Sequence, residues 1–240
     1  MFLAAVIQLN CTSNEQANWE SARSLIERAA GHGARFAATP ENTNYLGPHD
    51  EKVRRAEPLD GPTCGRFSGL ARRLGIHLLL GSFNERSDEP HRCYNTSVFF
   101  GPDGAILGTY RKMHLFDVDV PGGVRFAESD TCKPGEEVTV VDTPLGRFGL
   151  SICYDLRFPV WSRNRDDYDL LVYVANWPDR RHQAQHQQHP AQHTRRYRAQ
   201  RGYRRYHRMR QRHRACRYRP DYFYPAHPAL CCRRDKPGRF

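Results

Sequence analysis

Residues 3–42 read LAAVIQLNCTSNEQANWESARSLIERAAGHGARFAATPEN, and this stretch decides the class of fold. Residues 3–9 are rich in Val, Ile and Leu and have the length of a buried strand. In the next segment apolar residues recur at helical spacing, at Trp19, Ala22, Leu25, Ile26 and Ala29. Gly-His-Gly at 31–33 predicts the end of that helix, and a second apolar run follows it. Strand, helix and strand in succession indicate an α/β fold.

Further strands are predicted along the chain by short runs rich in Val, Ile, Leu and Phe. These runs are residues 76–83, 95–101, 138–144, 147–153 and 169–176. A second helix fits residues 63–75, which end in a glycine. Gly-Pro-Asp-Gly at 101–104 is typical of a hairpin turn that joins two antiparallel strands.

The composition changes abruptly near residue 181. Residues 181–240 contain 17 Lys and Arg against two acidic residues, with no Val, no Ile and one Leu. Residues 1–180 contain 20 basic and 24 acidic residues and resemble an ordinary mildly acidic domain. A segment so poor in apolar residues cannot bury enough surface to offset chain entropy. We therefore expect one domain over 1–180 and a basic tail over 181–240 that is disordered or non-native.

Two interpretations of the tail compete. Arginines interleaved with tyrosines are typical of an arm that binds nucleic acid. Translation out of frame through GC-rich coding sequence would also yield Arg, His, Gln, Pro and Ala with little Lys. The abrupt change directly after a predicted strand favours the second interpretation.

The eight cysteines show no pattern of a metal site or of a disulfide framework. No pair within 1–180 has CxxC spacing, and the N-terminal apolar run lacks the basic residues of an export signal. No run approaches the roughly 20 apolar residues of a membrane helix. We expect a cytoplasmic protein without metal or membrane contact, in which Cys64, Cys93 and Cys132 are packing or surface residues.

Three ionisable residues follow predicted strands or apolar runs. Glu41 comes just after an apolar run and a proline, Lys112 ends the second strand of the hairpin, and Cys153 ends the strand over 147–153. Because ligands of open α/β sheets bind outside strand ends, these residues could converge. A cysteine nucleophile needs a neighbouring base and a cation, which Glu41 and Lys112 would supply. Taken alone, however, the stretch SICYDLRFP (151–159) favours a buried, inert cysteine.

Three motifs in order, PEN (40–42), YRK (110–112) and CYD (153–155), resemble the nitrilase superfamily of carbon–nitrogen hydrolases. Residues 110–136 and 152–159 are most similar to the branch of omega-amidases and deaminated glutathione amidases. The resemblance covers about 1–180 and implies an αββα sandwich that is incomplete at its C-terminal end, because no later helix or strand is readable in 181–240. It also implies a homodimer for an intact member and no metal or organic cofactor.

The resemblance assigns a role to each site residue. Glu41 would be the general base, Lys112 the lysine that stabilises the oxyanion, and Cys153 the nucleophile. Glu128 would be a second glutamate that positions the lysine or the substrate, and the backbone N–H of Tyr154 a second oxyanion donor. The implied reaction is hydrolysis of the terminal amide of a small 2-oxo dicarboxylate monoamide through a Cys thioester, with release of ammonia.

Lesser candidates and alternatives stay open. Arg157 fits a structural ion pair or a carboxylate site, Tyr45 fits the wall of a pocket, and His114 fits a structural role. Since the predicted scaffold is incomplete, the alternatives to an active amidase are an inactive pseudoenzyme and a protein that binds nucleic acid through its basic tail.

Overall fold

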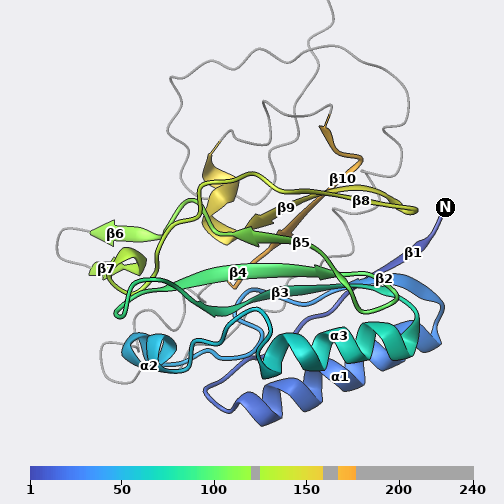
Figure 1. Ribbon diagram of the computed structural model, residues 1–240, viewed down its shortest axis with the longest axis horizontal. Coiled ribbons are helices and arrows are strands. Elements are labelled where there is room, and N and C mark those ends of the chain that lie inside the picture. The colour runs from blue at the N-terminus through green and yellow to red at the C-terminus, as the bar shows by residue number, and fades with distance from the viewer. Residues whose placement is uncertain (120–124, 159–166, 177–240) are drawn as a thin grey trace, which may run out of the picture. The chain divides into compact units, whose positions relative to one another are not determined.

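The computed structural model describes residues 1–119, 125–158 and 167–176 (Figure 1). The predicted tail and the predicted boundary at residue 180 lie outside these residues. Among the described helices, none is long and apolar enough to cross a membrane.

The larger sheet has five strands in the order β1-β2-β3-β4-β5. They are β1 (Leu3–Val6), β2 (Ala34–Ala38), β3 (His77–Arg86), β4 (Cys93–Phe100) and β5 (Ile106–Arg111). The first three pair in parallel, and β4 and β5 each pair antiparallel to the preceding strand. Consequently β5 runs in the same direction as β2 and β3. These three strands end at the same edge of the sheet.

Helices cover one face of this sheet (Figure 1). They are α1 (Glu15–Gly31) and α3 (Pro62–Leu74), and a short helix α2 (His49–Arg54) lies between them in sequence. Asn14 caps α1 by accepting a hydrogen bond from the backbone of Ala17 at 3.0 Å. The core beneath these helices contains Ile26, Phe67 and Leu80.

A second sheet packs on the other face of the first. Its order is β10-β9-β8, from β8 (Val140–Thr143), β9 (Gly146–Ile152) and β10 (Leu170–Val174). Phe36 and Phe99 of the first sheet meet Phe148 of the second with ring centroids 4.9 and 5.2 Å apart. These rings form the centre of the apolar layer between the sheets.

Four smaller elements complete the described part of the chain. A two-stranded hairpin consists of β6 (Asp117–Asp119) and β7 (Arg125–Ala127). Two short 3₁₀ helices are η1 (Glu128–Asp130) and η2 (Cys153–Arg157).

All the strands and both helices predicted from the sequence are present, with ends shifted by a few residues. The predicted hairpin is β4–β5. Short elements without a clear pattern, α2, β6, β7 and the 3₁₀ helices, were not predicted. The described residues supply one helix layer and two sheet layers of the predicted αββα sandwich.

Candidate active site

The direction of the strands gathers the predicted residues. Glu41 follows the end of β2 and Lys112 the end of β5, so both lie at one edge of the larger sheet. Cys153 directly follows β9 in the facing sheet. Figure 1 shows the arrowheads of β5 and β9 close to η2. The structure thus brings together groups that are 41 to 112 residues apart in sequence.

The loop that carries Glu41 is held against β3. The backbone of Asn42 donates to Ser82 Oγ at 2.8 Å, and the backbone of Thr43 donates to the Ser82 carbonyl at 2.8 Å. Gly81 makes this approach possible, because a Cβ at this position would overlap the carbonyl oxygens of Thr39 and Pro40. Glu41 therefore projects from a loop whose backbone is fixed.

Lys112, Glu41 and Glu128 form a buried carboxylate–lysine cluster. Lys112 Nζ lies 3.0 Å from Glu41 Oε1 and 2.9 Å from Glu128 Oε2. The three residues are 2%, 3% and 5% exposed. Buried charges are stable only when they are paired in this way.

The charges in the cluster fix its protonation states. Burial would lower the pKa of Lys112, but the nearby carboxylates of Glu41 and Glu128 raise it above its ordinary value. Burial would raise the pKa of Glu128, but the Lys112 ammonium and a backbone hydrogen bond from Phe116 hold it below its usual range. Lys112 is therefore a cation and Glu128 an anion at neutral pH.

Asn95 in β4 also belongs to the site, and the sequence did not indicate it. Its Nδ2 donates to Glu41 Oε1 at 2.9 Å and to Glu128 Oε1 at 3.4 Å. The backbone of Asn176, just after β10, donates to the other oxygen of Glu41 at 2.9 Å. Both oxygens of Glu41 thus have protein partners that fix the carboxylate plane.

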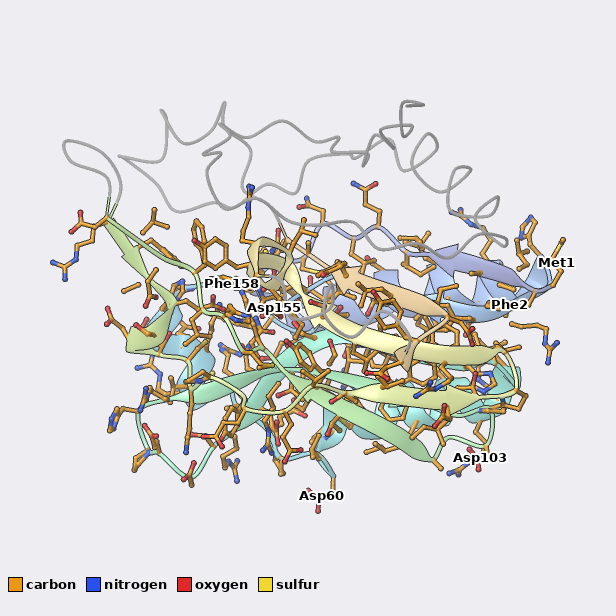
Figure 2. All side chains as sticks on the ribbon, turned by 90° about the horizontal axis from the view of Figure 1, so that it is seen from above. Met1, Phe2, Asp60, Asp103, Asp155 and Phe158 are labelled. Atoms are coloured by element: carbon orange, nitrogen blue, oxygen red, sulfur yellow. The ribbon has the colours of Figure 1, made fainter. Side chains whose placement is uncertain are left out.

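Cys153 lies on a sharp turn between β9 and η2. Its φ is 47°, in the left-handed region that side chains other than glycine rarely adopt. Asp155 stabilises the turn by accepting from the backbone of Ile152 at 2.9 Å and from the Tyr110 hydroxyl at 2.8 Å. Figure 2 labels Asp155 and Phe158 at this short helix. Cys153 thus lies on a strained turn where the strand ends, and such strain clusters at functional sites.

The Cys153 thiol is within electrostatic reach of the cluster. Burial raises the pKa of this thiol well above its ordinary value, and the charge and hydrogen bond of Glu41 raise it further, whereas Lys112 opposes them. Cys153 is therefore a thiol in the resting protein, with a carboxylate beside it that can accept its proton.

The other residues that the sequence singled out are His114, Tyr45 and Arg157; the first two make structural contacts and the third is exposed. His114 donates from its backbone to Asp155 Oδ1 at 2.9 Å, and its ring stacks on Phe158 with centroids 3.8 Å apart. Tyr45 is fully buried and donates to Glu51 at 3.0 Å. Both contacts are structural, and that of Tyr45 is with a residue of α2. Arg157 is exposed on η2.

The arrangement combines a thiol, a carboxylate base and a buried cation, which together suit acyl transfer. Within the described ranges no three His, Cys, Asp or Glu side chains lie close enough together to hold a metal ion.

Comparison with protein families gives one match over most of the chain. The family described as carbon–nitrogen hydrolase matches residues 3–202. An omega-amidase of Danio rerio is 40% identical over 174 residues, which are 72% of this chain and 62% of the relative. A deaminated glutathione amidase of Mus musculus is 40% identical over 162 residues, 65% of this chain and 50% of the relative.

Solved structures are similar as well. The NitFhit protein of C. elegans aligns with a TM-score of 0.69 at 34% identity, over 74% of this chain and 44% of that one. A CN-hydrolase superfamily protein of Xanthomonas campestris aligns with a TM-score of 0.58 at 32% identity, over 74% of this chain and 65% of that one. The alignments span about half to three fifths of the length of the curated relatives.

Proposed function

Because the chain belongs to the carbon–nitrogen hydrolase family, we propose that it is an amidase that hydrolyses the terminal amide of a small 2-oxo dicarboxylate monoamide. One observation carries the proposal: the carboxylate–lysine cluster is buried next to the Cys153 thiol. Relatives that are about 40% identical bear the names omega-amidase and deaminated glutathione amidase, which supports the choice of an amide.

The first step is formation of a thioester. Glu41 accepts the proton of the Cys153 thiol, and the thiolate attacks the carbonyl carbon of the amide. The raised pKa of Cys153 supports this order, because the thiol needs a base at the moment of attack. The carbonyl oxygen becomes an oxyanion in the tetrahedral intermediate.

Two donors would stabilise this oxyanion. Lys112 is a buried cation that the neighbouring carboxylates hold in its charged form. Tyr154 is the second residue of η2, and the first turn of a helix leaves backbone N–H groups without a partner inside the helix. Donors that are fixed before the reaction need no reorganisation when the charge develops.

Collapse of the intermediate breaks the carbon–nitrogen bond. Glu41 returns its proton to the leaving nitrogen, which departs as ammonia and leaves the acyl group on Cys153. Glu41 then takes a proton from water, whose oxygen attacks the thioester. A second collapse releases the carboxylic acid and restores the thiol. Glu128 positions Lys112 through the 2.9 Å ion pair.

The experiment measures ammonia release from a short 2-oxo dicarboxylate ω-amide by the purified 240-residue chain. The expected result is release by the wild type and by the Cys64→Ala variant, which replaces a buried cysteine within α3, and none by Cys153→Ala. Intact-mass spectrometry after rapid acid quenching should detect an acyl adduct on the wild type, even where turnover is slow. Equal ammonia release by Cys153→Ala, or an adduct on another residue, would overturn the proposal.

A further inference from the structure

Cys93 and Cys132 face each other across a backbone bridge. Cys93 begins β4, and Cys132 follows η1 by two residues. The two residues form an isolated parallel β-bridge. The backbone of Cys93 donates to the Thr131 carbonyl at 2.9 Å, and the backbone of Lys133 donates to the Cys93 carbonyl at 2.9 Å. Bridged residues of this kind have Cα atoms about 4.8 Å apart, within the range that a disulfide spans.

The two side chains are also in contact. The Cys132 thiol donates to the Cys93 sulfur, the Cys93 thiol donates to the Thr131 carbonyl at 3.6 Å, and neither cysteine is in a disulfide. Cys93 is 0% and Cys132 1% exposed, and they pack with Ala56, Val53 and Leu115. The sequence interpretation treated both as packing cysteines, and their burial agrees with that role. A packing role does not, however, require that the two sulfurs lie in contact with each other.

We propose that Cys93 and Cys132 are a redox-active pair, which hydrogen peroxide converts into an intramolecular disulfide and a thiol reductant restores. The pair is separate from the proposed nucleophile. It stands on the backbone bridge, the contact between the thiols and their shared burial.

Local charge favours Cys93 as the thiol that reacts first. The hydrogen bond with Cys132 lowers the pKa of Cys93 below its ordinary value against the opposing effect of burial, and the Lys52 charge lowers it further. The same hydrogen bond and burial raise the pKa of Cys132 well above its ordinary value. Lys52 is itself only 5% exposed, so solvent screens its charge little. A thiolate next to a cation is the form that oxidants attack.

The chemistry is balanced by one molecule of peroxide. The Cys93 thiolate attacks one peroxide oxygen and breaks the O–O bond, which gives a sulfenic acid and, with one proton, water. The sulfur of Cys132 then attacks the sulfenic sulfur and loses its proton, and the second oxygen leaves as water. Two thiols lose two electrons and the peroxide gains them. Reduction by dithiothreitol reverses the result through thiol–disulfide exchange.

The bond has a consequence for the site that rests on the proposed function. A disulfide brings the two sulfurs to about 2.0 Å, closer than hydrogen-bonded thiols. Cys132 is tied to Glu128 by a 2.8 Å backbone hydrogen bond, so the shift reaches η1. Cys93 lies two residues before Asn95, on the same face of β4. The disulfide therefore displaces Glu128, which belongs to the carboxylate–lysine cluster, and Asn95, which donates hydrogen bonds to it.

The test uses the full chain and non-reducing tryptic digestion. Trypsin releases Cys93 in residues 93–111 and Cys132 in residues 126–147, and each peptide contains a single cysteine. After treatment with hydrogen peroxide, the expected result is a linked peptide two hydrogen atoms lighter than the sum of the two, which dithiothreitol removes. The isolated buried cysteines Cys11 and Cys64, whose pKa values burial raises to about 12, should remain thiols.

Several results would overturn the pair. These are free Cys93 and Cys132 after peroxide has modified Cys153, oxidation of either thiol to a sulfinic acid without a link, or a link of either thiol to another cysteine. In the Cys132→Ala variant, a dimedone adduct should accumulate on Cys93, because the second thiol is missing. The linked peptide is read from the wild type by mass alone, so it stands or falls independently of any amidase activity.

The effect on the site is measured separately. At a dose that forms the link, the wild type should lose a larger fraction of its ammonia release than Cys132→Ala, and dithiothreitol should recover the difference. Equal losses in the two proteins would show that the link does not reach Glu128. Absence of ammonia release in both reduced proteins would contradict the proposed function and leave the peptide result intact.

Discussion

Asn42 and Cys153 adopt the same left-handed backbone conformation, with φ of 56° and 47°, although they follow strands of different sheets. Among the described residues, they are the only residues other than glycine with a positive φ. One directly follows Glu41 and the other is the proposed nucleophile. The strain thus coincides with the two groups that the proposed reaction must bring together.

Replacing Cys153 tests the strain at the turn. We expect Cys153→Gly to be more stable than Cys153→Ala by about 1–2 kcal/mol, because glycine adopts a φ of 47° without the penalty of a Cβ. Urea unfolding of the two variants measures the difference. A Cys153→Ala variant as stable as Cys153→Gly would show that the turn is not strained.

Lys112→Ala should impair both activity and stability. The variant loses an oxyanion donor, for which a fall in kcat of about 10²–10³ is expected. It also leaves the carboxylates of Glu41 and Glu128 buried without their cation, which costs about 3–5 kcal/mol in the free energy of unfolding. Ammonia release and urea unfolding measure the two effects. An activity within tenfold of the wild type would contradict the assigned role.

Asn95→Asp should be less stable than Asn95→Leu at neutral pH. The aspartate replaces a donor to Glu41 and Glu128 with a third carboxylate at a position that is 2% exposed. Burial and like charges raise the pKa of such an aspartate in the folded state. Its stability should therefore rise as the pH is lowered from about 8 to about 5, unlike that of the leucine variant. Parallel pH profiles for the two variants would contradict this expectation.

Gly81→Ala should loosen the loop that carries Glu41. The added Cβ overlaps the carbonyl oxygens of Thr39 and Pro40, so the loop must move away from β3. We expect a loss of about 1–3 kcal/mol in stability and a fall in kcat. Gly65→Ala in α3 is the matched control, since a Cβ there meets no atom within 4 Å and should stabilise the helix. Similar behaviour of the two variants would show that the close approach at Gly81 is unimportant.

His49 makes the stability depend on pH. Burial, together with the Lys52 charge, lowers the pKa of His49 to about 4 in the folded chain, against about 6.5 in the unfolded chain. Between these values the unfolded chain binds a proton that the folded chain does not, so stability falls as the pH decreases. Between about pH 7 and about pH 4.5, the free energy of unfolding of His49→Gln should fall by about 1–3 kcal/mol less than that of the wild type. Urea unfolding at the two pH values measures the difference. Identical losses in both proteins would contradict the assignment.

The sequence predicted those parts of the molecule that have a strong local signal. Long apolar runs indicated the strands of both sheets, and ionisable residues after them indicated Glu41, Lys112 and Cys153. Glu128 came from the resemblance to the family, because η1 has no pattern of its own.

Asn95 could not be predicted in the same way. It begins the strand-like run NTSVFFG (95–101), where a polar residue usually faces solvent. Its approach to Glu41 depends on β4 running antiparallel, so that the start of β4 lies at the edge where β2 and β5 end. That relation is set by pairing between strands and not by the strand's own residues. The contact between Cys93 and Cys132 depends on tertiary structure for the same reason.

The hydrogen bond from Asn176 to Glu41 sets an order of events during synthesis. It joins residues 135 positions apart, and it orients the carboxylate only after β10 has docked beside β9. Contacts of such long sequence separation form late, because chain entropy must first be overcome. A nascent chain that has not yet extended past residue 176 therefore has Glu41 without one of its partners. The orientation of the Glu41 carboxylate is therefore complete only after the chain up to β10 and Asn176 has folded.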